Sequence, residues 1–447
     1  MNDTIAAIAT AHGIGSISII RLSGPGALSI ALSLSRRTTL EPRYATLSPL
    51  YETDGSLIDE AILLYFRAPR SFTGEEVVEF QCHGGFIVAE KILNAVLNAG
   101  ARLAEPGEFS KRAFLNGRLD LTQAEAIASL IEAKSEDAAR ILARQMKGEL
   151  RGYVEGVRDG LLEILAYSEV VIDYAEEDLP PDVVEQIALK LERIKTDLSR
   201  TLEASRRRSG LMQGYRVAII GKPNVGKSSL LNALLDYERA IVSDIAGTTR
   251  DTIEEQVRIG THLIRLVDTA GIRAASDEIE KIGIERSIAA IQNADIVIAL
   301  FDQSRECDSE DRSIIDLIEQ YRDEKPFIVV LNKTDLPVCF DTAALKSYTP
   351  LKLSCKEETA PLIDAVTALM DHDNESDEMM LISQRQIMAV GEAVAAIEDA
   401  DEPLRDGELE FFSFHINRAI RAVSSISRPY ELDEMFDKMF GQFCLGK

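Results

Sequence analysis

The chain has 447 residues, of which 46% are hydrophobic, and its 74 acidic and 49 basic residues give a formal net charge of −25. At roughly 100–200 residues a domain, this length predicts two to four domains with apolar cores. The acidic charge argues against wrapping nucleic acid over a broad basic face. Five dispersed cysteines without close pairs argue against a disulfide framework and a zinc site. Without a signal peptide or an apolar run of membrane-spanning length, we expect a soluble, cytoplasmic protein.

The first part of the chain, to about residue 118, has an α+β pattern. Residues 17–22 and 77–81 have strand character, and Asp54-Gly55 between two such runs predicts a hairpin. His83 stands beside two glycines in CHGG. We interpret it as a hydrogen-bonded turn histidine rather than a catalytic one, since no partner is evident in the sequence.

Helical periodicity extends from residue 122 to 208, interrupted at Pro180-Pro181. It returns in residues 387–400 and 409–426, after the acidic stretch 371–378. Neither set of helices alone makes a complete bundle. We therefore expect one helical domain, discontinuous in sequence, with another domain inserted into it.

The inserted segment opens with GKPNVGKSS, residues 221–229, between an apolar run and the helical stretch LLNALL. Gly221 and Gly226 allow backbone N–H groups to turn inward, and with the positive helix end they make an anion site. Lys227 can reach the β- and γ-phosphates of a nucleotide, and Ser228 can bind Mg²⁺. A plain glycine turn before a helix is the alternative that this stretch alone leaves open.

Three later stretches favour a nucleotide site that reads guanine. DTAG at 268–271 follows a second apolar run, and its aspartate can hold the Mg²⁺ shell. NKTD at 332–335 follows a third run, and Asp335 can accept hydrogen bonds from two guanine donors that adenine lacks. SCK at 354–356 can close over the guanine O6 with a backbone amide. Four such loops after successive strands predict a GTPase.

One position departs from the Ras-like pattern. Ile272 replaces the glutamine that orients the attacking water in Ras-like switches, and it cannot hydrogen-bond water. Either hydrolysis is poor, or another group orients the water. Upstream, GTTRD supplies Thr249 for Mg²⁺ and the γ-phosphate.

Taken together, these stretches resemble a known family, the tRNA modification GTPases MnmE, also called TrmE. The resemblance covers the whole chain, and its most specific marks are GKPNVGKSSLLNAL, SDIAGTTRD, DTAGIR, IEKIGIERS and the terminal FCLGK. It implies a multidomain α/β protein. The implied parts are an α+β, folate-binding-like dimerisation domain (1–118), an all-α helical domain in two pieces (119–212 and 377–447) and a Ras-like α/β P-loop GTPase domain (213–376).

In the GTPase domain the resemblance implies that K⁺ replaces an arginine finger and that Glu280 positions the attacking water. Mg²⁺ would be bound by Ser228 and Thr249. The implied K⁺ ligands are the Asn224 side chain and, largely through backbone oxygens, Ser243, Ile245 and Thr248. The full set of expected GTP contacts is Asn224, Val225, Gly226, Lys227, Ser228, Ser229, Ser243, Asp244, Ile245, Ala246, Gly247, Thr248, Thr249, Asp268, Thr269, Ala270, Gly271, Asn332, Lys333, Asp335, Ser354, Cys355 and Lys356.

The family's folate contacts correspond here to Arg21, Glu79, Arg118 and Lys447. Many relatives carry lysine in place of Arg118; arginine keeps the charge but changes the donor geometry. Cys444 in the tail has two interpretations, a reactive thiol in the modification chemistry and a compact buried side chain.

The family acts with a flavin-dependent partner, MnmG. Together they add an aminomethyl or carboxymethylaminomethyl group to C5 of the wobble uridine, position 34, of certain tRNAs. The one-carbon unit comes from a tetrahydrofolate derivative in its 5,10-methylene or formyl form, while FAD and NADH belong to the partner. The resemblance implies a homodimer that joins the partner in a heterotetramer. Two other functions stay open from the sequence: a ribosome-assembly GTPase of the Era or Der kind, and a nucleotide switch without one-carbon chemistry.

Overall fold

The computed structural model describes residues 3–11, 13–133, 135–173, 183–207, 209–239, 255–259, 262–267, 280–345, 348–357, 359–372 and 379–428. Contacts divide these residues into two units. The first unit contains the described parts of Met1–Ile131, Ala143–Lys195 and Met388–Lys447, and the second contains those of Glu132–Leu142 and Thr196–Ile387. The first unit is thus built from chain segments on both sides of the second.

The first unit begins with a six-stranded sheet in the order β3-β4-β5-β2-β1-β6. Neighbouring strands are antiparallel, except that β1 and β6 are parallel. The hairpin predicted at Asp54-Gly55 is confirmed, since β3 and β4 pair on either side of it. The strands are β1 (Ile5–Ile8), β2 (Ile17–Ser23), β3 (Thr46–Tyr51), β4 (Leu57–Phe66), β5 (Val77–His83) and β6 (Arg102–Leu103).

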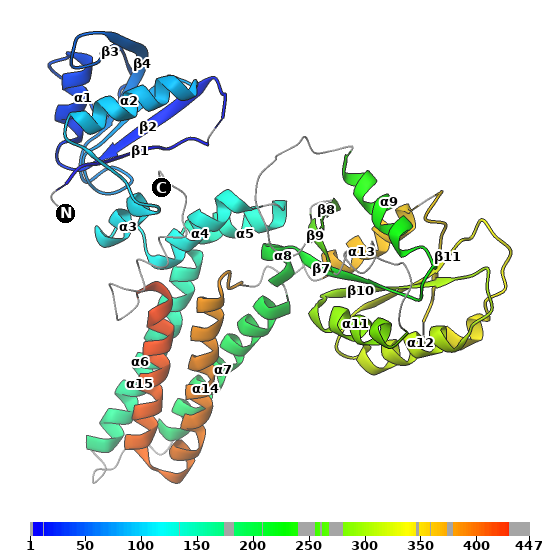
Figure 1. Ribbon diagram of the computed structural model, residues 1–447. Helices are drawn as coiled ribbons and strands as arrows, with labels where there is room; N and C mark the ends of the chain where they lie inside the picture. Colours follow the sequence, from blue (N-terminus) through cyan, green and yellow to red (C-terminus); the bar gives the residue numbers. More distant parts are fainter. Residues whose placement is uncertain are drawn as a thin grey trace. The chain divides into compact units, whose positions relative to one another are not determined.

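Helices pack on both faces of this sheet. Successive side chains along a strand point to opposite faces, so each face presents its own apolar side chains to a helix. Ala6 of β1 belongs to the core that the sheet shares with α1 and α2 (Figure 1). Its neighbours Ile5 and Ala7 belong to a second core with Phe109 of α3. The three helices are α1 (Ala27–Ser35), α2 (Phe86–Asn98) and α3 (Glu108–Leu115).

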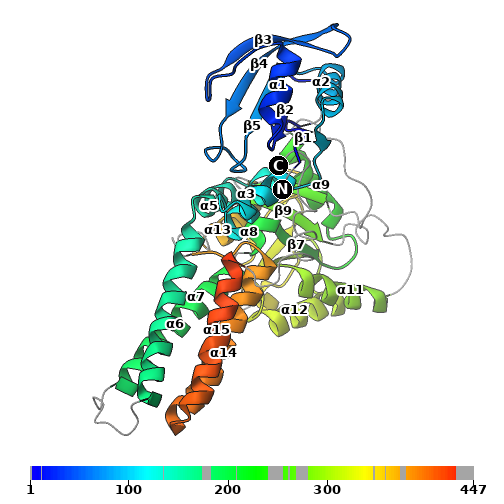
Figure 2. The ribbon, with the colours of Figure 1, turned by 90° about the vertical axis from the view of Figure 1, so that its left-hand side faces the viewer.

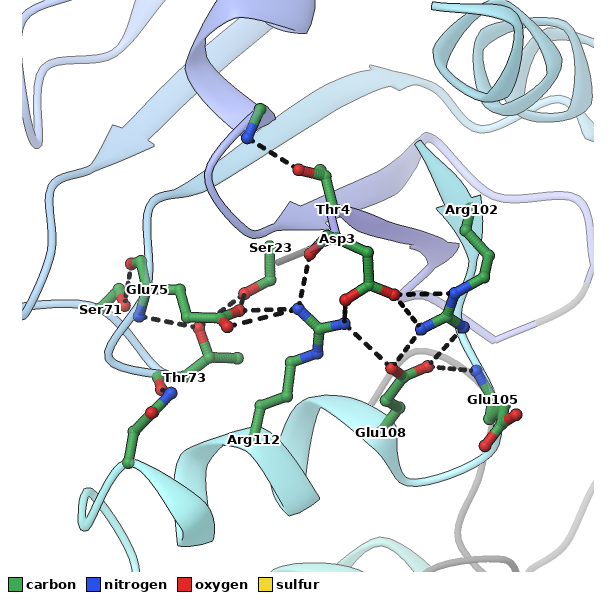
Figure 3. Close-up of polar contacts among 12 residues, drawn as sticks. Asp3, Thr4, Ser23, Ser71, Thr73, Glu75, Arg102, Glu105, Glu108 and Arg112 are labelled. Carbon is green, nitrogen blue, oxygen red and sulfur yellow. Dashed lines mark hydrogen bonds and ion pairs between the residues drawn. The ribbon is translucent and has the colours of Figure 1, made fainter. Parts of the chain in front are cut away.

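An ionic network around the buried Arg112 ties α3 to the start of the chain (Figure 3). The guanidinium of Arg112, only 1% exposed, donates to the backbone oxygen of Asp3 at 2.9 Å and to its Oδ1 at 2.9 Å. The same guanidinium lies 3.2 Å from Glu75 and 3.1 Å from Glu108. Arg102 joins from β6, 2.7 Å from both Asp3 and Glu108. Two arginines and three carboxylates thus compensate one another, with Arg112 and Glu108 buried and with Arg102 and Asp3 nearly half exposed at the edge of the network.

The network changes the acidity of its carboxyl groups. Hydrogen bonds from Arg102 lower the pKa of Asp3. Burial alone would raise the pKa of Glu108, yet hydrogen bonds from Arg102, the Glu105 amide and Arg112 lower it below its usual range. A carboxyl group with a lowered pKa in the folded state contributes stability above its unfolded pKa of about 4. That contribution is lost as the pH falls through the folded pKa.

We predict that Arg112→Met reduces hydrogen-exchange protection in β1 and α3 by about 3–5 kcal/mol at pH 7, because it removes the buried cation of the network and leaves the largely buried Glu75 without its guanidinium partner. The difference from the wild type should shrink as the pH falls from about 4 through the lowered folded-state pKa values of Asp3 and Glu108. Lys91→Met is the control, since Lys91 forms an exposed pair with Glu52 at 3.3 Å in the same sheet-and-helix region, a class of pair that contributes about 0–1 kcal/mol. Equal effects of the two substitutions would contradict the prediction.

Helices from both sides of the second unit pack together within the first. Helices α15 and α6 run side by side (Figures 1 and 2), with the buried hydroxyls of Ser168 and Ser413 at 3.0 Å. Lys195 of α7 donates to Asp401 of α14 at 3.2 Å. These contacts confirm that the helical domain is discontinuous in sequence. The helices are α4 (Leu121–Glu132), α5 (Glu136–Met146), α6 (Glu149–Asp173), α7 (Val183–Arg207), α8 (Ser209–Gln213), α14 (Gln384–Asp406) and α15 (Leu409–Ser427).

The helical pattern that the sequence shows from residue 122 to 146 is divided into two helices, α4 and α5. The Ser135 hydroxyl accepts a hydrogen bond from the Ala138 amide at 3.2 Å and so caps the start of α5. Of the helices in the described parts of the chain, none is long and apolar enough to cross a membrane.

The second unit contains a six-stranded sheet in the order β12-β11-β10-β7-β9-β8, parallel except that β8 runs antiparallel to β9. The three apolar runs singled out in the sequence are β7, β9 and β11, as predicted. The strands are β7 (Tyr215–Ile220), β8 (Glu255–Ile259), β9 (His262–Val267), β10 (Ile296–Asp302), β11 (Phe327–Asn332) and β12 (Leu351–Lys352).

This sheet is covered by helices on both faces (Figure 1). Val217 of β7 belongs to a core with α9 and α13, and the next residue, Ala218, belongs to a core with α11 and α12. All seven residues of β10 are buried, which is typical of a central strand in a doubly wound sheet. The helices are α9 (Lys227–Arg239), α11 (Glu280–Asn293), α12 (Ser309–Tyr321) and α13 (Ala360–His372), with a 3₁₀ turn at Thr342–Leu345. In such a fold ligands bind beyond the carboxyl ends of the strands.

Candidate functional site

The loop between β7 and α9 has a backbone that only glycine fits at two positions. Gly226 has φ +107°, and a Cβ there would lie 2.3 Å from Nδ2 of Asn332. Gly221 has φ +153°, and a Cβ there would lie 2.5 Å from the backbone oxygen of Leu300. The glycines therefore let the loop pass close to β10 and β11 and turn into α9, whose N-terminal amides favour an anion.

Lys227, the first residue of α9, bends back over this loop. Its ammonium donates to the backbone oxygens of Gly221 at 2.6 Å and Lys222 at 2.9 Å. Burial lowers the pKa of Lys227. A partly desolvated ammonium at a helix N-terminus is suited to phosphate oxygens, the role that the sequence predicts for this residue. Ser228 and Ser229 follow in the first turn of α9.

Asn332, at the end of β11, connects three of the predicted loops. Its Nδ2 donates to the Val225 backbone oxygen in the phosphate loop at 2.7 Å. Its Oδ1 accepts from the amide of Cys355, beyond β12, at 3.0 Å. A buried carboxamide that uses both ends in this way fixes the distance between the loops it joins.

Lys333 makes a second connection to the phosphate loop. Its ammonium donates to the Asn224 backbone oxygen at 2.9 Å and to Oδ2 of Asp302 at 2.6 Å. Burial alone would raise the pKa of Asp302, but hydrogen bonds from Lys333 and Ser304 lower it. Asp302 is therefore ionised and anchors the lysine.

The predicted base-reading residues meet at the same edge of the sheet. The Ser354 hydroxyl donates to Oδ1 of Asp335 at 3.0 Å, which orients the carboxylate expected to bind guanine. Cys355 is buried, and burial raises the pKa of its thiol to about 11. Cys355 therefore contributes its backbone amide, while Lys356 is exposed.

The structure brings together the predicted GTP contacts of the phosphate loop, NKTD and SCK. Glu280 is the first residue of α11. The remaining expected GTP and metal contacts, 243–249 and 268–271, and the tail residues Cys444 and Lys447 lie outside the described residues.

Sequence reasoning missed two groups of site residues. Asp302 could have been found, because it ends the apolar run of β10 as Asn332 ends that of β11. Lys222 lies within the phosphate-loop motif, but the motif assigns no role to its side chain and does not indicate its partners Asp308 and Asp311. Their contact depends on the sheet order, which spacing alone does not give.

The first unit brings two of the expected folate contacts together. Arg21 and Glu79 are opposite one another on β2 and β5, with Arg21 Nε donating to Glu79 Oε1 at 2.9 Å. The Arg21 guanidinium lies 5.6 Å from the ring centre of Phe72 and 5.9 Å from that of Phe109. Arg118 donates to the backbone oxygen of Ser71, next to Phe72, at 3.1 Å.

His83 is hydrogen-bonded, as expected from the sequence, but it is the last residue of β5 rather than a turn residue. Its Nδ1 lies 2.7 Å from Oδ1 of Asp59, and its amide donates to Asp59 Oδ2 at 2.9 Å. The partner is on β4, beside β5, so it was not recognisable from local sequence.

A doubly wound sheet with a phosphate loop after β7 and an Asn-Lys-x-Asp loop after β11 defines a phosphate-loop GTPase domain. Family models described as "GTP-binding protein TrmE N-terminus" and "MnmE helical domain" match residues 4–118 and 121–444. The chain belongs to the MnmE (TrmE) family of tRNA modification GTPases. The multidomain α/β architecture predicted from the sequence is confirmed.

Curated relatives match over the full chain. The tRNA modification GTPase MnmE of Sulfurimonas denitrificans is 64% identical over 445 residues, covering 100% of this chain and 99% of its own. The proteins of the same name from Sulfurovum sp. and Wolinella succinogenes are 60% and 53% identical, covering 100% of this chain and 99% and 98% of their own. A ribosome-assembly GTPase of the Era or Der kind would not explain why residues 4–118 match the TrmE N-terminal model.

We predict that Asp335→Asn weakens GTP binding by about 10²-fold or more, because two hydrogen bonds to a charged acceptor contribute about 1.5–3 kcal/mol each. Affinity for xanthosine triphosphate should rise, since its ring offers a carbonyl to the new amide. Displacement of a fluorescent nucleotide measures both. The control is Asp341→Asn, an exposed carboxylate of the same unit that caps a 3₁₀ turn. Unchanged GTP affinity in Asp335→Asn would show that this loop does not read the base.

Proposed function

We propose that this GTPase acts with a flavin-dependent partner of the MnmG kind to add an aminomethyl or carboxymethylaminomethyl group to C5 of uridine 34 in tRNA. The one-carbon unit comes from a 5,10-methylene or formyl tetrahydrofolate on the first domain, and FAD and NADH bind to the partner. The observation that carries the proposal is the Arg21–Glu79 pair, within the segment that matches the family's N-terminal type.

In this proposal residues 1–118 form the folate-binding and dimerisation domain, and 213–376 form the GTPase domain. Residues 119–212 and 377–447 form the two pieces of the helical domain. The chain acts as a homodimer that joins its partner in a heterotetramer.

The chemistry of a folate suits the residues of the first domain. A pterin ring presents a 2-amino group and a ring N–H side by side, and a carboxylate such as Glu79 can accept from both. Arg21 holds that carboxylate by its Oε1. The exposed cation Arg118, together with Lys447, would bind the carboxylates of the folate tail. Cys444 would lie near the transferred carbon, either as a reactive thiol or as a packing residue.

The GTPase reaction is proposed to use Mg²⁺ and K⁺. Ser228 in the first turn of α9 and Thr249 would hold Mg²⁺. Asn224 is exposed on the phosphate loop at φ 65°, and Lys333 holds its carbonyl. The backbone of Asn224 is therefore held in place, and its side-chain amide oxygen suits a hard cation. Ser243, Ile245 and Thr248 would be the other ligands. The cation supplies positive charge beside the phosphates, where Ras-like enzymes use an arginine.

We predict that GTP hydrolysis is much faster in KCl than in NaCl at equal ionic strength, by a factor that approaches the roughly 10³–10⁵ of an arginine finger. Asn224→Ala should remove most of this difference while GDP binding persists. Equal rates of the wild type in the two salts would contradict the role of K⁺.

Glu280→Ala should slow the chemical step by about 10²-fold or more, the usual contribution of a positioned acid–base group. Nucleotide dissociation constants should change little, because Glu280 would contact the water rather than the nucleotide. Single-turnover hydrolysis measures the step. A rate near that of the wild type would mean that another group positions the water.

The function itself is tested by nucleoside analysis of bulk tRNA from a strain that lacks the gene. The C5-modified wobble uridine should be lost, and the wild-type gene should restore it. Arg21→Ala and removal of the last four residues should fail to restore it while their GTP hydrolysis is retained. Cys444→Ser separates the two roles of the thiol: substantial modification indicates packing, and almost none indicates a reactive thiol. Normal modification in the deletion strain would overturn the proposal.

A further inference from the structure

Lys222, the second residue of the phosphate loop, points its side chain into the protein, toward the start of α12. The residue is only 7% exposed, and its ammonium lies 2.6 Å from Oδ2 of Asp308 and 2.5 Å from Oδ2 of Asp311. Burial alone would lower the pKa of Lys222, yet hydrogen bonds to the two carboxylates raise it. Lys222 is thus a buried cation with two anionic partners.

The two carboxylates are themselves held rigidly at the start of α12. Asp308 is the N-cap residue, and its Oδ1 accepts from the Asp311 amide at 3.0 Å. The Asp308 amide in turn donates to Oδ2 of Asp311 at 3.3 Å, which completes a capping box. Ile314 and Ile318 anchor the following turns of the helix in the apolar core. Lys222 therefore binds to a fixed point of the fold.

The backbone of Lys222 leads directly to the phosphate-binding lysine, because its carbonyl accepts from Lys227 Nζ at 2.9 Å. The other side of the loop is held through Asn224, Lys333 and Asp302, as described above. Asp302 and Asp308 belong to one segment, which runs from the end of β10 to the start of α12. That segment thus holds the phosphate loop at two points.

We propose that Lys222 is a positioning residue, which holds the phosphate loop and the Lys227 ammonium in place for the β-phosphate of the nucleotide. A buried ion pair is poor evidence for a purely stabilising role, because apolar residues of similar volume are often as stable. An apolar side chain at position 222 could not bind Asp308 and Asp311, so it would not hold the phosphate loop at a fixed distance from the start of α12. The inference concerns nucleotide binding and is independent of the folate and potassium proposals.

The test compares GDP with GMP in the full-length Lys222→Met variant, by displacement of a fluorescent guanine nucleotide. GMP reaches the base-reading loops but has no β-phosphate for Lys227. We expect GDP affinity to fall at least about tenfold and GMP affinity to change less than about twofold. The control is Lys325→Met, which removes a lysine that donates to the Ala294 carbonyl of the same unit at 2.7 Å. It should leave both affinities unchanged.

Equal losses of GDP and GMP affinity, or no loss of either, would overturn the proposal and leave Lys222 as a stabilising residue. If Lys222→Met does not fold, Asp311→Asn gives the same test, because it keeps the shape and one acceptor oxygen but removes a charge. Its GDP affinity should again fall more than its GMP affinity. A change in melting temperature with unaltered GDP affinity would overturn the proposal in either variant.

Discussion

The nucleotide site depends on one buried carboxamide. Asn332 donates to Val225 and accepts from Cys355, so the phosphate loop and the loop after β12 are both positioned by the end of β11. The same side chain makes glycine necessary at position 226, where a Cβ would lie 2.3 Å from its nitrogen. The Gly226 of the phosphate loop is therefore required by the base-reading side of the site as well as by the phosphates.

This arrangement explains why the sequence predicts that the phosphate loop, NKTD and SCK lie together. Each predicted loop follows an apolar run, and parallel strands bring their carboxyl ends to one edge of a sheet, so Asn332, Asp335 and Ser354 had to lie at the same edge as Lys227. The α+β pattern of the first part was also evident, since its strands alternate. Arg21 and Glu79 were assigned through the family resemblance alone, and their pairing across β2 and β5 is what the structure adds.

The ion pairs could not be predicted from the sequence, because their partners are far apart along the chain. Lys222 and Asp311 are 89 positions apart, and Arg112 and Asp3 are 109 apart. Periodicity shows which face of an element is buried but not which charged residues meet there. Lys222 reaches α12 only because β10 pairs directly with β7, so that the chain leaving β10 passes beside the phosphate loop.

The distribution of charge in the site has a consequence for a chain of net charge −25. Two of its lysines, Lys222 and Lys333, have carboxylates within 2.6 Å, so much of their charge is compensated inside the protein. Lys227 differs, since it donates to two backbone carbonyls, and burial lowers its pKa. An ammonium held by neutral groups keeps its field for an incoming phosphate, whereas one held by a carboxylate does not. The paired lysines thus serve to shape the loop, and the positive charge that faces the nucleotide is concentrated on Lys227 and the N-terminal amides of α9.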